Sequence, residues 1–144
     1  MNGNKLKHFR KMRGLTQKQL GMQIGYPEPT ADMRIAQYEN GRRTPKPETI
    51  KVLSDCLDVD PVALDCPEIG SDLKVILQIL FQMEDTFGLS VHEYESNPVL
   101  WFDCESELKD MLHEWALKAS QLRNGVISRE EYDQWRFGKK GGCA

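Results

Sequence analysis

The segment Ile24–Arg43, IGYPEPTADMRIAQYENGRR, decides how the front of this chain folds. Its later residues place Ala31, Ile35 and Tyr38 on one helical face, and an Asn-Gly pair then stops the helix. We therefore expect a helix over about residues 30–39. The earlier residues contain two prolines, which fix the backbone of a long turn and limit the entropy that such a turn costs.

Two short helices precede this turn. Apolar residues at helical spacing predict the first, over residues 5–12. The second follows Thr16, an N-cap residue that forms a capping box with Gln19, and it ends at Gly25. A small residue, Gly21, stands where this helix would cross the next one, so the pattern is that of a helix-turn-helix.

Two more helices are expected after the Asn-Gly stop. Pro47 suits a first helical turn, and the following apolar residues keep a helical spacing. An Asp-Pro pair at residues 60–61 starts a short fifth helix, and the domain closes near Leu64. The expected first domain is therefore a five-helix domain over residues 1–65.

Two stretches of this domain carry a family resemblance. LKHFRKMRGLTQKQLGMQIG and RIAQYENGRRTPKPETIKVLSDCLDVDPVAL closely resemble the lambda-repressor-like (Xre/Cro) helix-turn-helix family over about residues 6–64. The resemblance implies a domain that binds double-stranded DNA through its third helix. Typical members have a turn about four residues shorter, so YPEPTAD is an insertion that lengthens the turn without changing the helices on either side, and it leaves the register of the third helix's first turn open.

The resemblance also implies roles by position. An arginine of the first helix commonly pairs with the glutamate of a YENG-like segment, so we expect a structural ion pair between Arg10 and Glu39. Phosphate contacts are expected at the start of the second helix and in the basic segment after the third. The residues that we expect to hold phosphate are Gln17, Lys18, Asn40, Arg42, Arg43, Thr44 and Lys46.

Helical geometry indicates which residues could contact bases. At 100° per residue, an inward face of Ala31, Ile35 and Tyr38 turns Met33 and Gln37 outward. An outward glutamine suits adenine, an arginine suits guanine or a phosphate, and a methionine suits a thymine methyl group. The base-reading candidates are Thr30, Met33, Arg34 and Gln37.

The second half has a different pattern. An apolar helix is expected over residues 72–87, then a β-hairpin around Ser96-Asn97-Pro98, with Pro98 limiting the pairing beside the turn. A long helix capped by Asp103 or Ser106 follows, and a last short helix begins at a Ser128 capping box. The overall expectation is a mainly α protein, with a small α+β module over residues 71–138 and a flexible tail over 139–144.

Charge divides the chain in the same way. Residues 1–51 hold eleven Lys/Arg and four Asp/Glu, whereas residues 52–144 hold eight and eighteen. A basic front and an acidic rear indicate a polyanionic partner for the front alone. The four cysteines and the histidines have no metal-ligand spacing, and no nucleophile with a partnered base is visible, so we expect no metal, no cofactor and no catalytic activity.

These observations favour a cytoplasmic, sequence-specific transcriptional regulator. We expect a repressor that binds a near-palindromic operator as a homodimer, with dimerisation in the second half because the helix over 72–87 is apolar around much of its circumference. The alternative is an antitoxin-like protein-interaction module that neutralises a partner and autoregulates its operon. A ligand-controlled sensor is a third possibility, and the sequence names no effector. No secretory signal or membrane span is expected.

Overall fold

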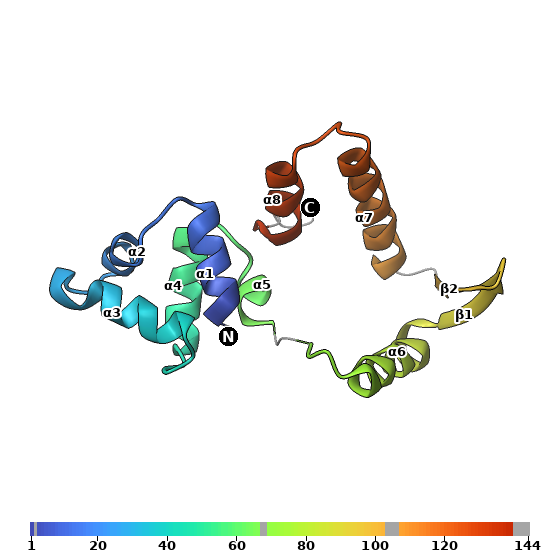
Figure 1. Cartoon of the computed structure of the whole chain (residues 1–144), viewed down its shortest axis with the longest axis horizontal. Coiled ribbons are helices and arrows are strands. Elements are labelled where there is room, and N and C mark those ends of the chain that lie inside the picture. Colours follow the sequence, from blue (N-terminus) through green and yellow to red (C-terminus); the bar gives the residue numbers. More distant parts are fainter. Residues whose placement is uncertain (2, 67–68, 103–106, 140–144) are drawn as a thin grey trace. The chain divides into compact units, whose positions relative to one another are not determined.

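The computed structural model describes residues 1, 3–66, 69–102 and 107–139, and these fall into two units. The first unit joins the described residues of Met1–Glu68 to those of Asp133–Ala144, and the second is Ile69–Tyr132. Helices dominate both units, and the second adds one two-stranded sheet (Figure 1). The mainly α fold expected from the sequence is therefore confirmed.

Five helices make up the front of the first unit. Their caps are those that the sequence indicates: the Thr16 hydroxyl accepts the Gln19 N–H at 3.1 Å, and the Asp60 carboxylate accepts the Val62 N–H at 2.7 Å. The helices are α1 (Gly3–Met12), α2 (Gln17–Gln23), α3 (Glu28–Glu39), α4 (Pro47–Leu57) and α5 (Pro61–Asp65).

The core of the first unit draws on all five helices. Its side chains are almost completely excluded from water, and burial of this kind contributes about 1.5–3 kcal/mol for each large apolar residue. Each helix therefore contributes at least one buried apolar residue to one shared core. The largest fully buried side chains of this core are Leu6, Phe9, Leu20, Ile35, Leu53, Leu57 and Leu64.

The start of α3 differs from the expectation. The helix begins at Glu28 rather than Thr30, with Pro27 as N-cap residue and Pro29 in the first turn, where a proline has no helical hydrogen bond to lose. Most of the expected insertion is therefore a first turn added to α3. The expectation that the insertion leaves the flanking helices unchanged is therefore wrong, and Tyr26 from this segment is half-buried and packs against the core.

The end of α8 (Arg129–Phe137) also differs from the expectation. We expected residues 71–138 to form the second module, but Asp133 and the residues after it belong to the first unit. The reason is packing: the Phe137 ring lies edge-on to Phe9, with centroids 5.2 Å apart, and the Phe137 carbonyl accepts the Asp60 N–H at 2.8 Å. Lys139, expected in the tail, pairs with Asp55.

A network of polar contacts fixes this C-terminal segment on the first unit. The guanidinium of Arg13 donates to the Gln134 side chain at 2.9 Å and pairs with the Asp58 carboxylate at 3.0 Å. Gln134 in turn donates to Asp58 at 3.2 Å. The described residues at the C-terminus therefore complete the domain that the N-terminus begins.

The second unit contains α6 (Leu73–Phe87), a β-hairpin of β1 (Leu89–Tyr94) and β2 (Asn97–Phe102), α7 (Glu107–Arg123) and the start of α8. The hairpin is antiparallel, and its turn residues Glu95 and Ser96 have φ of 48° and 65°. Pro98, expected to limit the pairing, lies opposite Glu93 within the ladder. Such a position suits an edge strand, because proline offers no N–H to a neighbouring strand.

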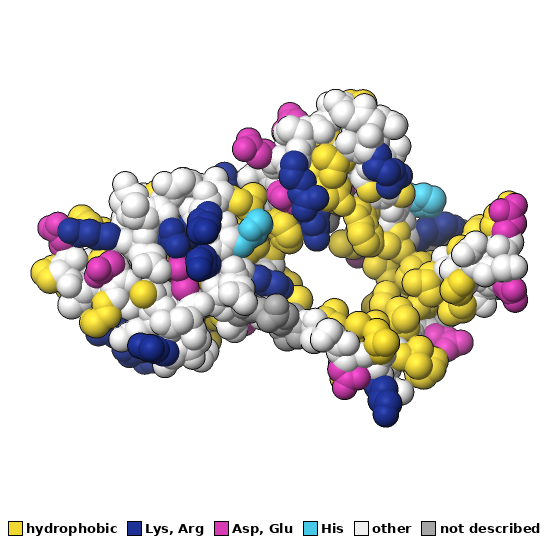
Figure 2. Space-filling view, viewed as in Figure 1, with side chains coloured by type: hydrophobic (Ala, Val, Ile, Leu, Met, Phe, Trp, Pro, Cys, Tyr) yellow, Lys and Arg dark blue, Asp and Glu magenta, His cyan; other side chains and the backbone are white. Residues whose placement is uncertain are grey.

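Apolar side chains of the second unit lie largely at the surface. Neither α6 nor α7 buries any of its described residues, and Figure 2 shows hydrophobic side chains over both helices. Leu73 is 78% exposed, and Trp115 is 51% exposed although its indole N–H donates to the Tyr132 hydroxyl at 2.8 Å. The apolar stripes that the sequence indicates are present, but this unit alone does not cover them.

Some expectations concern residues outside the described ranges. The predicted helix caps Asp103 and Ser106, the tail beyond Lys139, and Cys104 and Cys143 all lie there. Among the described residues, Cys56 and Cys66 form no disulfide. Among the described helices, none combines the length and the hydrophobicity that a membrane crossing requires.

Candidate nucleic-acid interface

The crossing of α2 and α3 sets the position of the candidate reading helix. A Cβ atom added to Gly21 would lie 2.5 Å from the carbonyl oxygen of Ala31, and Ala31 is fully buried. Only glycine therefore permits this approach of the two backbones. The close crossing holds the rest of α3 at a defined angle on the surface of the first unit.

A buried ion pair supports α3 from behind. The Arg10 guanidinium meets the Glu39 carboxylate in two contacts, from Nε to Oε1 at 2.6 Å and from Nη2 to Oε2 at 3.1 Å. Arg10 also donates to the Leu15 carbonyl at 2.7 Å. Arg10 and Glu39 are each 8% exposed, so removal of one partner would leave the charge of the other buried and unpaired.

Gln17 joins this pair. Its side-chain amide donates to the second carboxylate oxygen of Glu39 at 2.8 Å, and the residue is half-buried. The sequence assigned Gln17 to a phosphate contact, but the structure commits one of its amide hydrogens to the ion pair. The start of α2, the end of α3 and α1 are thereby joined through three side chains.

The base-reading candidates lie on α3 with different degrees of exposure. Met33 is 50% exposed, whereas Arg34 and Gln37 are half-buried. Thr30, in the first turn, directs its hydroxyl to the Pro27 carbonyl at 3.3 Å. One side of α3 thus presents a methionine, an arginine and a glutamine, while the Thr30 hydroxyl already has a backbone partner.

The segment after α3 keeps its cations at the surface. The Asn40 side chain accepts the Arg42 N–H at 3.1 Å, and the Arg43 N–H donates to the Gln37 carbonyl at 3.1 Å. These bonds fix the backbone and leave the side chains outward. The exposed residues assigned to phosphate are Lys18, Asn40, Arg42, Arg43, Thr44 and Lys46.

Lys18 has a partner that the sequence did not predict. Its ammonium group lies 2.7 Å from the carboxylate of Glu28, in the first turn of α3. The hydrogen bond and the charge of Glu28 raise the pKa of Lys18, and Lys18 lowers the pKa of Glu28 in return. A phosphate at the start of α2 would have to compete with this carboxylate. The pair was not foreseen because we assigned Glu28 to a loop.

Two tyrosines form a second unforeseen cluster. The hydroxyl groups of Tyr26 and Tyr38 lie 2.8 Å apart, and the Arg34 guanidinium lies over the Tyr26 ring, 5.7 Å from its centroid. Burial is the main cause that raises the pKa of Tyr38 to about 12, and the hydrogen bond with Tyr26 adds to it. Tyr38 was expected inside; the link to Tyr26 depends on how the turn folds.

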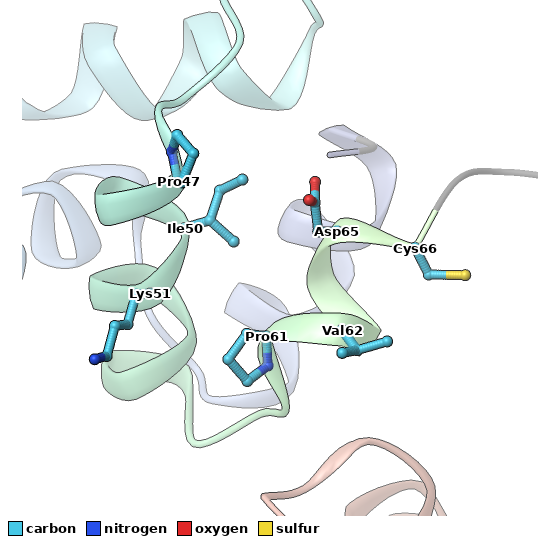
Figure 3. A pocket seen from close by; sticks show the side chains of 7 residues that line it. All are labelled: Pro47, Ile50, Lys51, Pro61, Val62, Asp65 and Cys66. Atoms are coloured by element: carbon cyan, nitrogen blue, oxygen red, sulfur yellow. The ribbon is translucent and has the colours of Figure 1, made fainter.

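An apolar groove lies elsewhere on the first unit, between α4 and α5, with a volume of about 520 Å³. In Figure 3 the side chains of Ile50 and Pro61 lie between the two helices, and Lys51 points away from them. Asp65 at its edge pairs with the N-terminal amine at 2.8 Å. Across the described residues, no group of three or more His, Cys, Asp or Glu side chains could hold a metal ion.

Comparison with a family model agrees with the geometry of α2 and α3. The helix-turn-helix family matches residues 6–64. Among solved structures, the chain is similar to the crystal structure of the transcriptional regulator BswR, with 33% sequence identity over 58% of this chain and 94% of that chain and a TM-score of 0.46. No curated protein matches the sequence. The family match identifies residues 6–64 as a helix-turn-helix domain, which supports a DNA-binding transcription regulator.

Proposed function

We propose that the protein is a sequence-specific repressor that binds a near-palindromic operator as a homodimer. The observation that carries the proposal is the surface of α3, where Met33, Arg34 and Gln37 stand beside the exposed cations of residues 42–46. A helix of this kind fits the major groove, and cations at its end suit the flanking phosphates. We also propose a cytoplasmic location, since the operator must be accessible.

Each side chain has a proposed part. Gln37 would pair with adenine and Arg34 with guanine or a phosphate, while Met33 would touch a thymine methyl group. Thr30 and Gln17 would make lesser contacts, because their side chains already have protein partners. Contacts with phosphates set the register of α3 in the groove but carry no sequence information themselves.

The homodimer is proposed to form through α6. Leu73, Leu77 and Phe81 recur every four residues along this helix and are 78%, 48% and 45% exposed. They form one apolar stripe beside the half-buried side of the helix, and an exposed stripe of this kind favours a partner. A second copy offers the same stripe, as a two-fold symmetric interface requires.

The antitoxin-like alternative draws on the same exposed side chains. A different protein that covers α6 and α7 would bury these side chains as well as a second copy would. The two accounts differ in the purified state: the homodimer forms from this chain alone, whereas the antitoxin stays monomeric until its partner is added.

Two experiments test the proposal with the full chain. Selection from a random pool of duplex DNA should enrich two inverted half-sites about one helical turn apart, and the absence of any enriched motif would exclude sequence-specific binding. Light scattering should give a dimer at micromolar concentration that Leu77→Glu converts to a monomer. Gln82→Glu, which adds the same charge at an exposed position of α6, is the control and should remain dimeric. A monomeric wild-type chain would contradict the homodimer.

A further inference from the structure

Tyr26 is held in place through both its backbone and its side chain. Its N–H donates to the Gly21 carbonyl at 2.9 Å, at the end of α2, and its hydroxyl meets that of Tyr38 at 2.8 Å. Tyr38 is only 5% exposed and belongs to the core. Pro27 follows directly and fixes the next part of the backbone. The Tyr26 ring therefore has a defined position beside α3.

Arg34 uses this ring as a support. Its guanidinium carbon lies 5.7 Å from the ring centroid, within the range in which a cation is attracted to the face of an aromatic ring. This attraction requires no hydrogen bond from the guanidinium, so the N–H groups of Arg34 remain available to an acceptor. Arginine is also among the side chains that lose most rotamer freedom when they are fixed.

From this geometry we propose that Tyr26 is a positioning residue for Arg34 and thereby determines specificity at the base pair that Arg34 reads. The inference rests on the proposed function. A side chain already held near its binding conformation loses less entropy when DNA arrives, so its contact discriminates more strongly between bases. The turn that distinguishes this chain from the family pattern would then position a base-reading residue of α3.

The hydroxyl pair does not compete for the arginine. Burial raises the pKa of Tyr38 to about 12, so its hydroxyl stays uncharged near neutral pH. A tyrosinate at position 38 would attract Arg34 and Arg43 away from the DNA, whereas the uncharged Tyr38 hydroxyl only fixes the ring. The cluster therefore combines an uncharged support with cations that remain available.

The test measures binding to the selected operator and to its single base-pair variants. Arg34→Ala should lower discrimination at one base pair by about ten-fold or more. Tyr26→Leu should lower discrimination at that same base pair by about two- to five-fold. Tyr26→Phe keeps the ring and should retain most of the discrimination. Tyr26→Leu combined with Arg34→Ala should match Arg34→Ala alone, because the two residues act as one unit.

Three results for Tyr26→Leu would overturn the inference. Unchanged discrimination would mean that the ring does not position Arg34, and increased discrimination would mean that the ring withholds Arg34 from DNA. A loss spread equally over all base pairs would also contradict it, since that pattern indicates a general structural role. Tyr38→Phe, which removes the same hydrogen bond from the other side, is the matched control for Tyr26→Phe.

A measurement on the wild-type chain covers the case in which Tyr26→Leu does not fold. NMR relaxation of the arginine Nε–H groups should show Arg34 more restricted than Arg42, whose side chain is exposed. Equal mobility of the two would overturn the inference. Failure of the proposed function itself looks different: the wild-type protein would then select no DNA motif, whatever the state of Arg34.

Discussion

Replacement of Phe137 by alanine tests whether the C-terminal segment belongs to the DNA-binding domain. Truncation of a fully buried phenylalanine to alanine lowers the free energy of unfolding by about 3–5 kcal/mol. Phe137 is half-buried and forms an edge-to-face pair with Phe9, so we expect the free energy of unfolding of the first unit to fall by about 2 kcal/mol. For a domain of this size the loss corresponds to a fall of about 8–16 °C in melting temperature.

Hydrogen exchange followed by mass spectrometry is the assay, because it assigns stability to each helix. Peptides from α1 and α4 of Phe137→Ala should exchange about 30-fold faster than those of the wild type, which corresponds to about 2 kcal/mol. Glu130→Ala, an exposed change in the first turn of the same helix, should leave them unchanged. Equal exchange in Phe137→Ala and Glu130→Ala, or a response confined to peptides from α6 and α7, would show that Phe137 does not stabilise the first unit.

Three further predictions concern the first unit. Glu39→Ala should destabilise it by about 3–5 kcal/mol in urea unfolding, because Arg10 keeps a buried and unpaired charge, and Arg10→Met in the same chain should recover part of the loss. Glu28→Gln should release Lys18 and steepen the salt dependence of DNA binding by about one unit, whereas Glu48→Gln, also exposed in a first helical turn, should not. Because the pKa of Tyr38 is raised to about 12 in the folded protein, its contribution to stability should be complete below about pH 10 and be lost as the pH rises through 12. The loss of stability should be at most about 3 kcal/mol, and it should be smaller in Tyr38→Phe. Equal pH profiles of the two proteins would contradict this prediction.

The helix-turn-helix could be derived from the sequence because its signals are local. The capping box of Thr16 and Gln19 and the Asn-Gly stop each act within a few residues, and the glycine at the α2–α3 crossing meets the next helix along the chain. The start of α3 was misplaced by two residues because two prolines, Pro27 and Pro29, suggested a loop. Proline also suits the first turn of a helix, and here that second property applies.

The contacts that could not be derived are long-range. Phe137 reaches Phe9 and Asp60 from the far end of the chain, and its apolar spacing in α8 fits an ordinary surface helix equally well. The Lys18–Glu28 and Tyr26–Arg34 contacts require the path of the turn between α2 and α3, which the family resemblance leaves open. In the second unit, the apolar residues of α6 were identified, but their exposure follows only from the structure.

Reading of bases by α3 is the central claim, and one comparison tests it most directly. Binding of the wild type, Gln37→Ala and Arg43→Ala is measured on the selected operator and all its single base-pair variants, over a range of salt concentrations. Gln37→Ala should lose about 1–3 kcal/mol of discrimination at one base pair and leave the salt slope unchanged. Arg43→Ala should weaken binding to every sequence alike and lower the slope by about one unit. Equal, uniform losses in both variants would contradict the claim that α3 reads the operator.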